Sequence, residues 1–176
     1  MATKINSRRK GAKNERDLAK LLEVWTNKKF AKTPASGGLN WKNTNVAGDI
    51  VCTTEGHYFP FCIEAKTYKD INFIHLLNPN KKGVKVKEFW DQAVRDSTKA
   101  NKVPLLFMRY NGMPKGLHFI MMTSSFYLEH FDIPLETTIT LKLPCYLGAL
   151  VLTTSTEFFK SNYKKIKKSL KKNGKR

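Results

Sequence analysis

Acidic residues are scarce in this chain. Its 176 residues include 14 Asp and Glu against 32 Lys and Arg, for a formal net charge of +18 at pH 7. Residues 1–13 and 160–176 contain five and nine basic residues and no acid, which leaves 18 basic and 14 acidic residues, or +4, between them. Basic ends on a nearly balanced body favour a polyanionic partner, most simply a nucleic acid. A generic solubility tail has the same charge pattern.

Cysteines and long apolar runs are also sparse. Cys52, Cys62 and Cys145 form no CxxC pair, which argues against a structural zinc site and is typical of small buried residues in a reducing compartment. The longest apolar stretch, residues 145–152, is far too short to span a bilayer. The N-terminus lacks the apolar segment of a signal peptide. We therefore expect a cytoplasmic protein with one main domain.

Hydrophobic periodicity predicts alternating helices and strands. Residues 11–25 have the i, i+3, i+4, i+7 spacing of an amphipathic helix. After a polar loop over residues 33–48, we expect an antiparallel hairpin over residues 49–66, with the chain reversing at Gly56. Further elements are predicted as short helix 73–77, helix 85–100, and strands 103–110, 117–122 and 137–143. This order implies a mixed sheet with helices packed on it.

Two acids and a lysine stand out on the predicted hairpin. Because side chains alternate between faces along a strand, Glu64 and Lys66 point away from the apolar side chains of Phe61 and Ile63. Pairing of the strands brings Asp49 beside Glu64. Two adjacent carboxylates repel, and a divalent cation such as Mg²⁺, which prefers oxygen ligands, relieves that repulsion. The alternatives are a turn aspartate at residue 49 and a solvated strand face at residues 64 and 66.

A third acid, Glu15, continues the core-facing stripe of the first predicted helix, three residues before Leu18. An unpaired carboxylate that faces a sheet is costly to desolvate, and a functional site would explain it. The alternative is an exposed acid near a helix start, where negative charge favours the helix dipole. A helix-borne Glu followed by an Asp and then Glu-X-Lys on strands favours the functional interpretation.

These residues carry a family resemblance. Gly48-Asp49 followed by Glu64-Ala65-Lys66 resembles the PD-(D/E)XK nuclease superfamily, although Gly48 stands where many members have Pro. Residues 9–18 and 85–92 resemble archaeal-type and phage Holliday junction resolvases. The resemblance implies an α/β, restriction-endonuclease-like core of the αβββαβ type, a mixed β-sheet flanked by helices, with basic terminal extensions. The corresponding division is a basic N-terminal arm, a nuclease domain and a basic C-terminal helix or tail, at residues 1–13, 14–155 and 156–176.

The resemblance also implies roles for individual residues. Asp49 and Glu64 match the metal ligands, and the carbonyl of Ala65 adds a third protein oxygen. Glu15 matches a helix-borne acid that binds the metal or its water. Lys66 matches the lysine that positions or activates the attacking water. The implied cofactor is Mg²⁺, with Mn²⁺ as a possible substitute.

Two further candidates rest on the same resemblance. Ser36 matches a functional loop serine and is a candidate phosphate contact, with an ordinary loop serine as the alternative. Gln92, on the predicted second helix, is a candidate contact to the site. Binding to DNA is expected from basic residues at both ends and at the start of that helix: Arg8, Arg9, Lys10, Lys13, Lys85, Lys164, Lys165, Lys167 and Lys168.

The sequence thus predicts a Mg²⁺-dependent, structure-selective endodeoxyribonuclease. A Holliday junction resolvase acting on branched double-stranded DNA in recombination or repair, in the host-cell cytoplasm if the source is a phage, is the function we favour. A homodimer is expected, because a four-way junction needs two paired nicks. The alternatives are another recombination, repair or restriction nuclease of the superfamily, and a non-catalytic architectural protein that binds nucleic acid.

Overall fold

The computed structural model describes residues 7–33, 47–77, 84–131, 138–142 and 148–173. Ser36 and Cys145 lie outside these residues. The main sheet contains five strands in the order β3-β4-β5-β7-β6, with β3 and β4 parallel and the other neighbours antiparallel. Their bounds are β3 Phe61–Tyr68, β4 Val103–Tyr110, β5 Phe119–Thr123, β6 Ile139–Lys142 and β7 Ala149–Thr154. A two-stranded antiparallel sheet is formed by β1 (Phe30–Lys32) and β2 (Ile50–Cys52).

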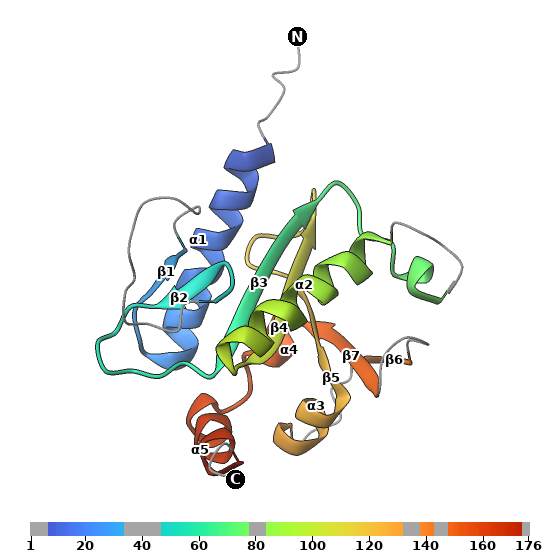
Figure 1. Cartoon of the computed structure of the whole chain (residues 1–176). Coiled ribbons are helices and arrows are strands. Elements are labelled where there is room, and N and C mark those ends of the chain that lie inside the picture. The colour runs from blue at the N-terminus through green and yellow to red at the C-terminus, as the bar shows by residue number, and fades with distance from the viewer. Residues whose placement is uncertain (1–6, 34–46, 78–83, 132–137, 143–147, 174–176) are drawn as a thin grey trace.

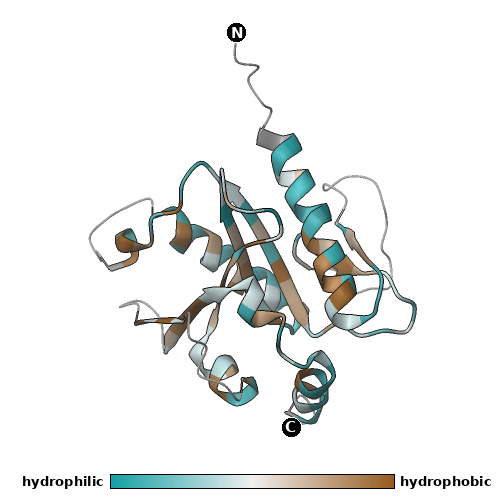
Figure 2. Ribbon diagram, turned by 180° about the vertical axis from the view of Figure 1, so that it is seen from behind, coloured by the Kyte–Doolittle hydropathy of each residue, from teal (hydrophilic) through white to brown (hydrophobic). Residues whose placement is uncertain are grey.

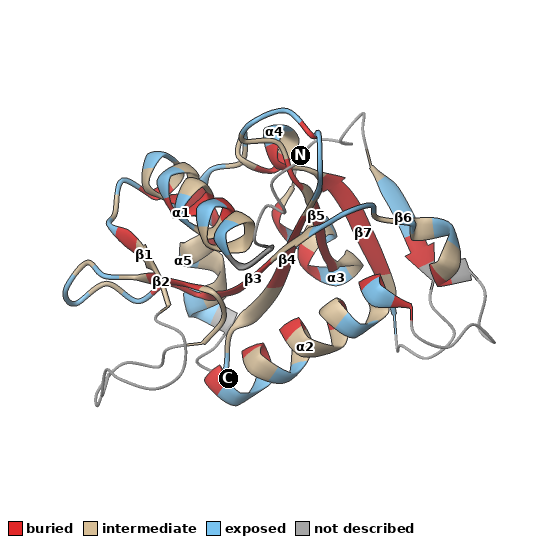
Figure 3. Cartoon of the chain, turned by 90° about the horizontal axis from the view of Figure 1, so that it is seen from above, coloured by how far each residue is buried: buried red, intermediate tan, exposed pale blue. Residues whose placement is uncertain are grey.

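Helices cover both faces of the main sheet. α1 (Ser7–Thr26) and α5 (Tyr163–Asn173) lie on one face, and α2 (Lys85–Ala100) lies on the other (Figures 1 and 3). The shorter helical elements are η1 Phe73–Leu77, α3 Ser124–His130 and α4 Ser155–Phe158. This mixed sheet flanked by helices has the restriction-endonuclease-like fold that the sequence predicts. Within the described residues, no helix has the length and apolar character needed to cross a membrane.

The two faces of the main sheet bury two separate cores. Phe61 and Ile63 belong to the core shared with α1, whereas Leu106 and Met108 of the neighbouring β4 belong to the core beneath α2. α1 is hydrophilic in its N-terminal half and largely hydrophobic in its C-terminal half (Figure 2). The C-terminal half of α1 is therefore the part suited to packing against the sheet. The N-terminal half carries mainly polar side chains.

The C-terminal basic segment is part of the folded body. Tyr163 and Ile166 of α5 are buried in the core that contains α1, and Leu170 packs against the same cluster. Trp25 of α1 packs against Tyr163 with tilted rings, their centroids 5.0 Å apart, and its indole N–H donates to the carbonyl of Ser161. The apolar seam in this lysine-rich segment therefore fixes a helix on the body and leaves most of its lysines outward.

Several predicted elements are confirmed. The helix at 85–100, the strand at 103–110 and the short helix at 73–77 have the predicted bounds, the last as a 3-10 helix. The first helix begins at residue 7, so residues 7–13 of the predicted basic arm are helical. β1, β7 and α3 are additional elements that the periodicity did not reveal. β1 has only three residues and α3 only seven, so each contains fewer than two full repeats of its hydrophobic period.

The predicted antiparallel hairpin over residues 49–66 is wrong. β2 pairs with β1, and the amide of Thr53 donates to the carbonyl of Lys29, so another strand occupies the hydrogen-bonding edge that the hairpin needed. The segment just before β2 is joined to β3 by a parallel bridge between Gly48 and Ile63. The carboxylates at positions 49 and 64 are nevertheless brought together, by this bridge rather than by a hairpin.

Candidate active site

Asp49 is fixed against the open edge of β3. Its backbone N–H donates to the carbonyl of Ile63 at 2.7 Å, and its Oδ2 accepts from the N–H of Ala65 at 2.8 Å. This close approach requires a glycine at position 48, because a Cβ there would lie 2.4 Å from the oxygen of Ile63. Gly48 also has φ +83°, which proline cannot adopt. The departure from the superfamily's usual proline thus changes the backbone before the acid and keeps the acid in place.

Glu64 is a buried carboxylate with one cationic neighbour. Its side chain is 1% exposed, and it forms an ion pair with Lys66, whose side chain is 24% exposed. The ammonium of Lys66 also lies 5.8 Å from the ring centroid of Phe89 on α2. The predicted placement of Glu64 and Lys66 on one face of the strand is therefore confirmed. Lys66 lies at the more accessible end of the pair.

Both carboxylates have pKa values raised above the ordinary range. Burial raises the pKa of Glu64 to about 7, and the nearby charge of Asp49 adds to the increase despite the opposing effect of Lys66. Burial also raises the pKa of Asp49, and the charge of Glu15 contributes in the same direction, while the hydrogen bond from Ala65 lowers it. Without a cation, the folded protein therefore favours a proton on this pair.

Glu15 is close enough to Asp49 to affect its pKa, but it is not the unpaired carboxylate that the sequence suggested. Its Oε2 accepts a hydrogen bond from the ammonium of Lys32 at 2.5 Å. Lys32 ends β1, a three-residue strand without a sequence signature, so this partner was not foreseen. The ion pair holds the helix-borne acid beside β1 and β2, at the border of the site.

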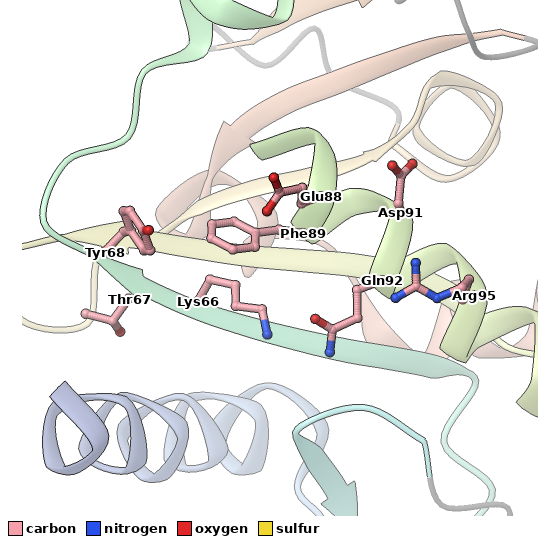
Figure 4. Close-up of a pocket in the computed structure, with 8 residues that line it drawn as sticks. All are labelled: Lys66, Thr67, Tyr68, Glu88, Phe89, Asp91, Gln92 and Arg95. Atoms are coloured by element: carbon pink, nitrogen blue, oxygen red, sulfur yellow. The ribbon is translucent and has the colours of Figure 1, made fainter. Parts of the chain in front are cut away.

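Gln92 shares a pocket with Lys66. The pocket has a volume of about 540 Å³ and lies between β3 and α2. Figure 4 shows the side chains of Lys66 and Gln92 pointing toward the same space above β3. Glu88, Asp91 and Arg95 line the pocket on the α2 side. The placement is consistent with the expected contact of Gln92 with the site, and its role remains a prediction.

The basic residues expected to bind DNA lie at several places. Lys10 and Lys13 are on the first turns of α1, as is Arg9, whereas Lys85 forms an exposed ion pair with Glu88. On α5, Lys164, Lys165 and Lys168 are exposed. Lys167 is half-buried instead, with its ammonium 3.3 Å from Nδ1 of His57. The side chain of Arg8 and all of Ser36 lie outside the described residues, and binding to DNA remains a prediction for the whole set.

The donor set fits a hard divalent cation. Among the described residues, no three His, Cys, Asp or Glu side chains gather closely enough to form a metal centre by themselves. Asp49 and Glu64 supply two carboxylates, and the oxygens of Glu64 are buried with the ammonium of Lys66 as their ion-pair partner. The carbonyl of Ala65 faces the same open edge as its N–H. Two carboxylates with a carbonyl and waters suit Mg²⁺.

The fold and this arrangement of acids define the class of PDDEXK nucleases, which typically use divalent metal ions. Residues 6–168 match the family described as "Phage putative PDDEXK endonuclease", and the chain belongs to that family. A curated relative is Protein D14 of Escherichia phage T5. It is 28% identical over 123 residues, which cover 69% of this chain and 73% of Protein D14. The superfamily resemblance and the nuclease assignment are thereby confirmed, whereas neither comparison tests the resolvase assignment.

Proposed function

We propose that the protein is a Mg²⁺-dependent endodeoxyribonuclease that resolves four-way DNA junctions as a homodimer. The observation that carries the nuclease chemistry is the buried Glu64 carboxylate held against Asp49 at the open edge of β3. Such a pair is costly to keep ionised without a cation. A structural role alone gives no reason for the chain to retain it. The proposed metal ligands are Asp49, Glu64 and the Ala65 carbonyl, with Glu15 acting on the metal or on its water.

The residues of the site divide the hydrolysis of a phosphodiester among them. Mg²⁺, when bound, lowers the pKa of water and neutralises charge on the phosphate. Lys66 places a positive charge at the mouth of the site, where it stabilises the charge that develops on the phosphate and orients the attacking water. Gln92 lines the same pocket and is placed to hold the substrate beside Lys66. The carboxylate of Glu15 is already paired with the ammonium of Lys32, so this ion pair limits its contact with the metal or its water.

Two features support a branched duplex as the substrate. The formal net charge of +18, with Lys13 exposed on α1 and Lys164, Lys165 and Lys168 exposed on α5, suits contact with phosphates over a wide surface. The resemblance of residues 9–18 and 85–92 to junction resolvases adds the preference for a four-way junction. A two-fold dimer supplies the two paired active sites that symmetric nicking of such a junction requires.

Cleavage of four substrates side by side tests the proposal. Four-way junction, flap, nicked duplex and linear duplex are incubated with the wild type and Mg²⁺, with Glu64→Gln as the matched inactive control. We expect paired nicks on opposite strands of the junction, at least about tenfold faster than cleavage of linear duplex, and a dimer in sedimentation. Equal cleavage of all four would favour another superfamily nuclease. Tight binding to DNA without cleavage in Mg²⁺ or Mn²⁺ would favour the architectural alternative.

A further inference from the structure

A second pocket lies next to the candidate active site and has a strongly basic wall. It has a volume of about 280 Å³ and is formed by the N-terminal half of α1, the end of β3 and the turn between β4 and β5. Among the described residues, one acid, Asp17, lines it beside four basic side chains: Lys10, Lys13, Arg109 and Lys115. An excess of three positive charges around a concave site favours an anionic ligand.

Two polar atoms of the pocket residues lack partners. Asn14 is 4% exposed, and its Nδ2 has no hydrogen-bond partner among the described residues. The hydroxyl of Thr67 is likewise buried without a partner in that part of the chain. Leaving a buried polar group unsatisfied costs roughly 1–3 kcal/mol. A ligand with several acceptor oxygens would satisfy both groups.

His118 fixes the orientation of the Asn14 amide. Burial lowers the pKa of His118 to about 4, so its ring carries a single N–H at neutral pH. The carbonyl of Gly116, which also accepts the hydroxyl of Ser155 at 3.1 Å, lies 3.2 Å from Nδ1, whereas Oδ1 of Asn14 lies closer to Nε2, at 2.8 Å. We therefore assign the ring N–H to Nε2, which donates to Oδ1 of Asn14 at 2.8 Å. This assignment leaves the amide nitrogen of Asn14 as the free donor.

The cations of the pocket are available to a ligand. Lys10, Lys13 and Lys115 form no salt bridge with any described residue. Arg109 donates from Nη2 to the carbonyls of Met113 and Pro114, at 2.7 and 3.3 Å. A guanidinium has five N–H donors, so these two bonds position the group without exhausting it. The cavity is thus lined by Arg109, whose guanidinium is held by two carbonyls, and by lysines without an ion pair among the described residues.

This pocket and the acid site use neighbouring residues of the same two elements. Asn14 precedes Glu15 on α1, and Thr67 follows Lys66 on β3. Thr67 borders both pockets, but because successive side chains of a strand point to opposite faces, its hydroxyl and the ammonium of Lys66 lie on different sides of β3. An anion in the basic pocket is therefore distinct from the phosphate under attack. The residues that line its pocket are nevertheless sequence neighbours of site residues on both α1 and β3.

We propose that this pocket binds a non-scissile phosphate of the DNA backbone and thereby sets the position of the substrate strand relative to the acids. The inference rests on the proposed function, because it requires DNA as the substrate. Asn14 and Thr67 supply hydrogen bonds, and the basic side chains supply charge. Backbone phosphates hold position and orientation rather than sequence, which suits an enzyme that recognises shape.

Charge reversal at the rim gives the first test. Lys13→Glu/Lys115→Glu changes two exposed pocket lysines, and Lys20→Glu/Lys99→Glu changes two exposed lysines outside it by the same total charge. Affinity for a four-way junction is measured by fluorescence anisotropy in metal-free buffer over a salt series. We expect the pocket variant to bind roughly tenfold more weakly than its control, with a salt slope lower by about 1 for one lost phosphate contact. Equal affinities and slopes for the two variants would overturn the inference.

Thr67→Val gives a second test that does not change charge. The substitution keeps the branched shape and removes an unpartnered hydroxyl, so we expect a melting temperature equal to or above that of the wild type. Affinity for the junction should nevertheless fall by roughly 10–100-fold, because a hydrogen bond to a charged phosphate is lost. A hydroxyl with a merely structural role would leave the affinity unchanged.

The source of the phosphate is tested separately. A methylphosphonate, which removes one backbone charge, is placed in turn at each position of the junction strand. We expect one non-scissile position at which it weakens the wild type but not Lys13→Glu/Lys115→Glu. If inorganic phosphate shifts the NMR signals of the Asn14 amide but no such position exists, the pocket serves a free phosphate and the inference is overturned. Failure of the wild type itself to bind or cleave DNA would instead refute the proposed function.

Discussion

On one face of β3, Phe61 and Ile63 are fully buried among apolar side chains, whereas on the other face the ionisable Glu64 is buried almost as completely. The apolar face removes hydrocarbon surface from water and stabilises the fold. On the polar face, burial raises the pKa of Glu64, and the positive charge of Lys66 only partly offsets this increase. One strand thus combines a framework that fixes geometry with a site whose stability depends on an added proton or cation.

The largest expected effect is the loss of DNA cleavage when an acid of the polar face is replaced. Glu64→Gln or Asp49→Asn should reduce the rate of junction cleavage at least roughly 1,000-fold, because each removes a negative ligand and several kcal/mol of charge stabilisation. Affinity for the junction should stay within about threefold, since the basic surface provides most phosphate contacts. Single-turnover cleavage and anisotropy measure the two quantities. Wild-type cleavage by either variant would remove that acid from the active site.

Phe61→Ala tests the opposite face. The ring is fully buried and lies 5.9 Å from that of Trp25 and 5.4 Å from that of Phe59, between centroids. Its removal should lower the free energy of unfolding by about 3–5 kcal/mol. Urea denaturation measures this change. Cleavage per folded molecule, at a temperature where the variant is folded, should remain within a few fold of wild type. A small stability change with lost cleavage would reverse the roles given to the faces.

Lys66→Ala should slow single-turnover cleavage roughly 100-fold, because a charge beside the reacting phosphate is lost. Binding of Mn²⁺, measured by calorimetry, should persist. Lys69→Ala is the matched control, because Lys69 is exposed just beyond β3. This variant should cleave at the wild-type rate. If Lys66→Ala also cleaves at that rate, Lys66 belongs to a solvated strand face and takes no part in the chemistry.

The smallest expected effect concerns stability without metal. The pKa of Glu64 is raised to about 7 in the folded state, so between its ordinary value and 7 the folded protein holds a proton that the unfolded chain has released. Stability should therefore fall as pH rises through this window, by at most about 1.4 kcal/mol per pH unit, and then level off. Asp49, whose pKa is also raised, acts in the same direction.

Glu64→Gln cannot release that proton, so its melting temperature in metal-free buffer should exceed that of the wild type more at pH 8 than at pH 5. Differential scanning fluorimetry across pH measures the gap, and Mg²⁺ should close it by stabilising the wild type alone. A variant that melts well below the wild type at every pH would show that the Glu64 carboxylate has a structural role.

Local patterns predicted the elements that are long and strongly periodic. α2 and β4 have the predicted bounds, and the alternation that separates Glu64 from Ile63 is confirmed. The three-residue β1 was missed because it contains too few repeats of the two-residue strand period to form a pattern. The hairpin was wrongly predicted because a turn signal at Gly56 does not reveal that β1 takes the pairing edge of β2. Strand partners are set by contacts distant in sequence.

The sequence by itself determined the types and order of the site residues, the basic ends and the apolar seam that fixes α5, since these depend on composition and on periods within one element. Only the tertiary structure decided that Gly48 brings Asp49 onto the edge of β3, and that Lys32 neutralises Glu15. It alone placed Asn14 and Thr67 in one basic pocket. These arrangements join segments far apart in the chain, and their energies arise from burial and close approach, which exist only once the elements have packed.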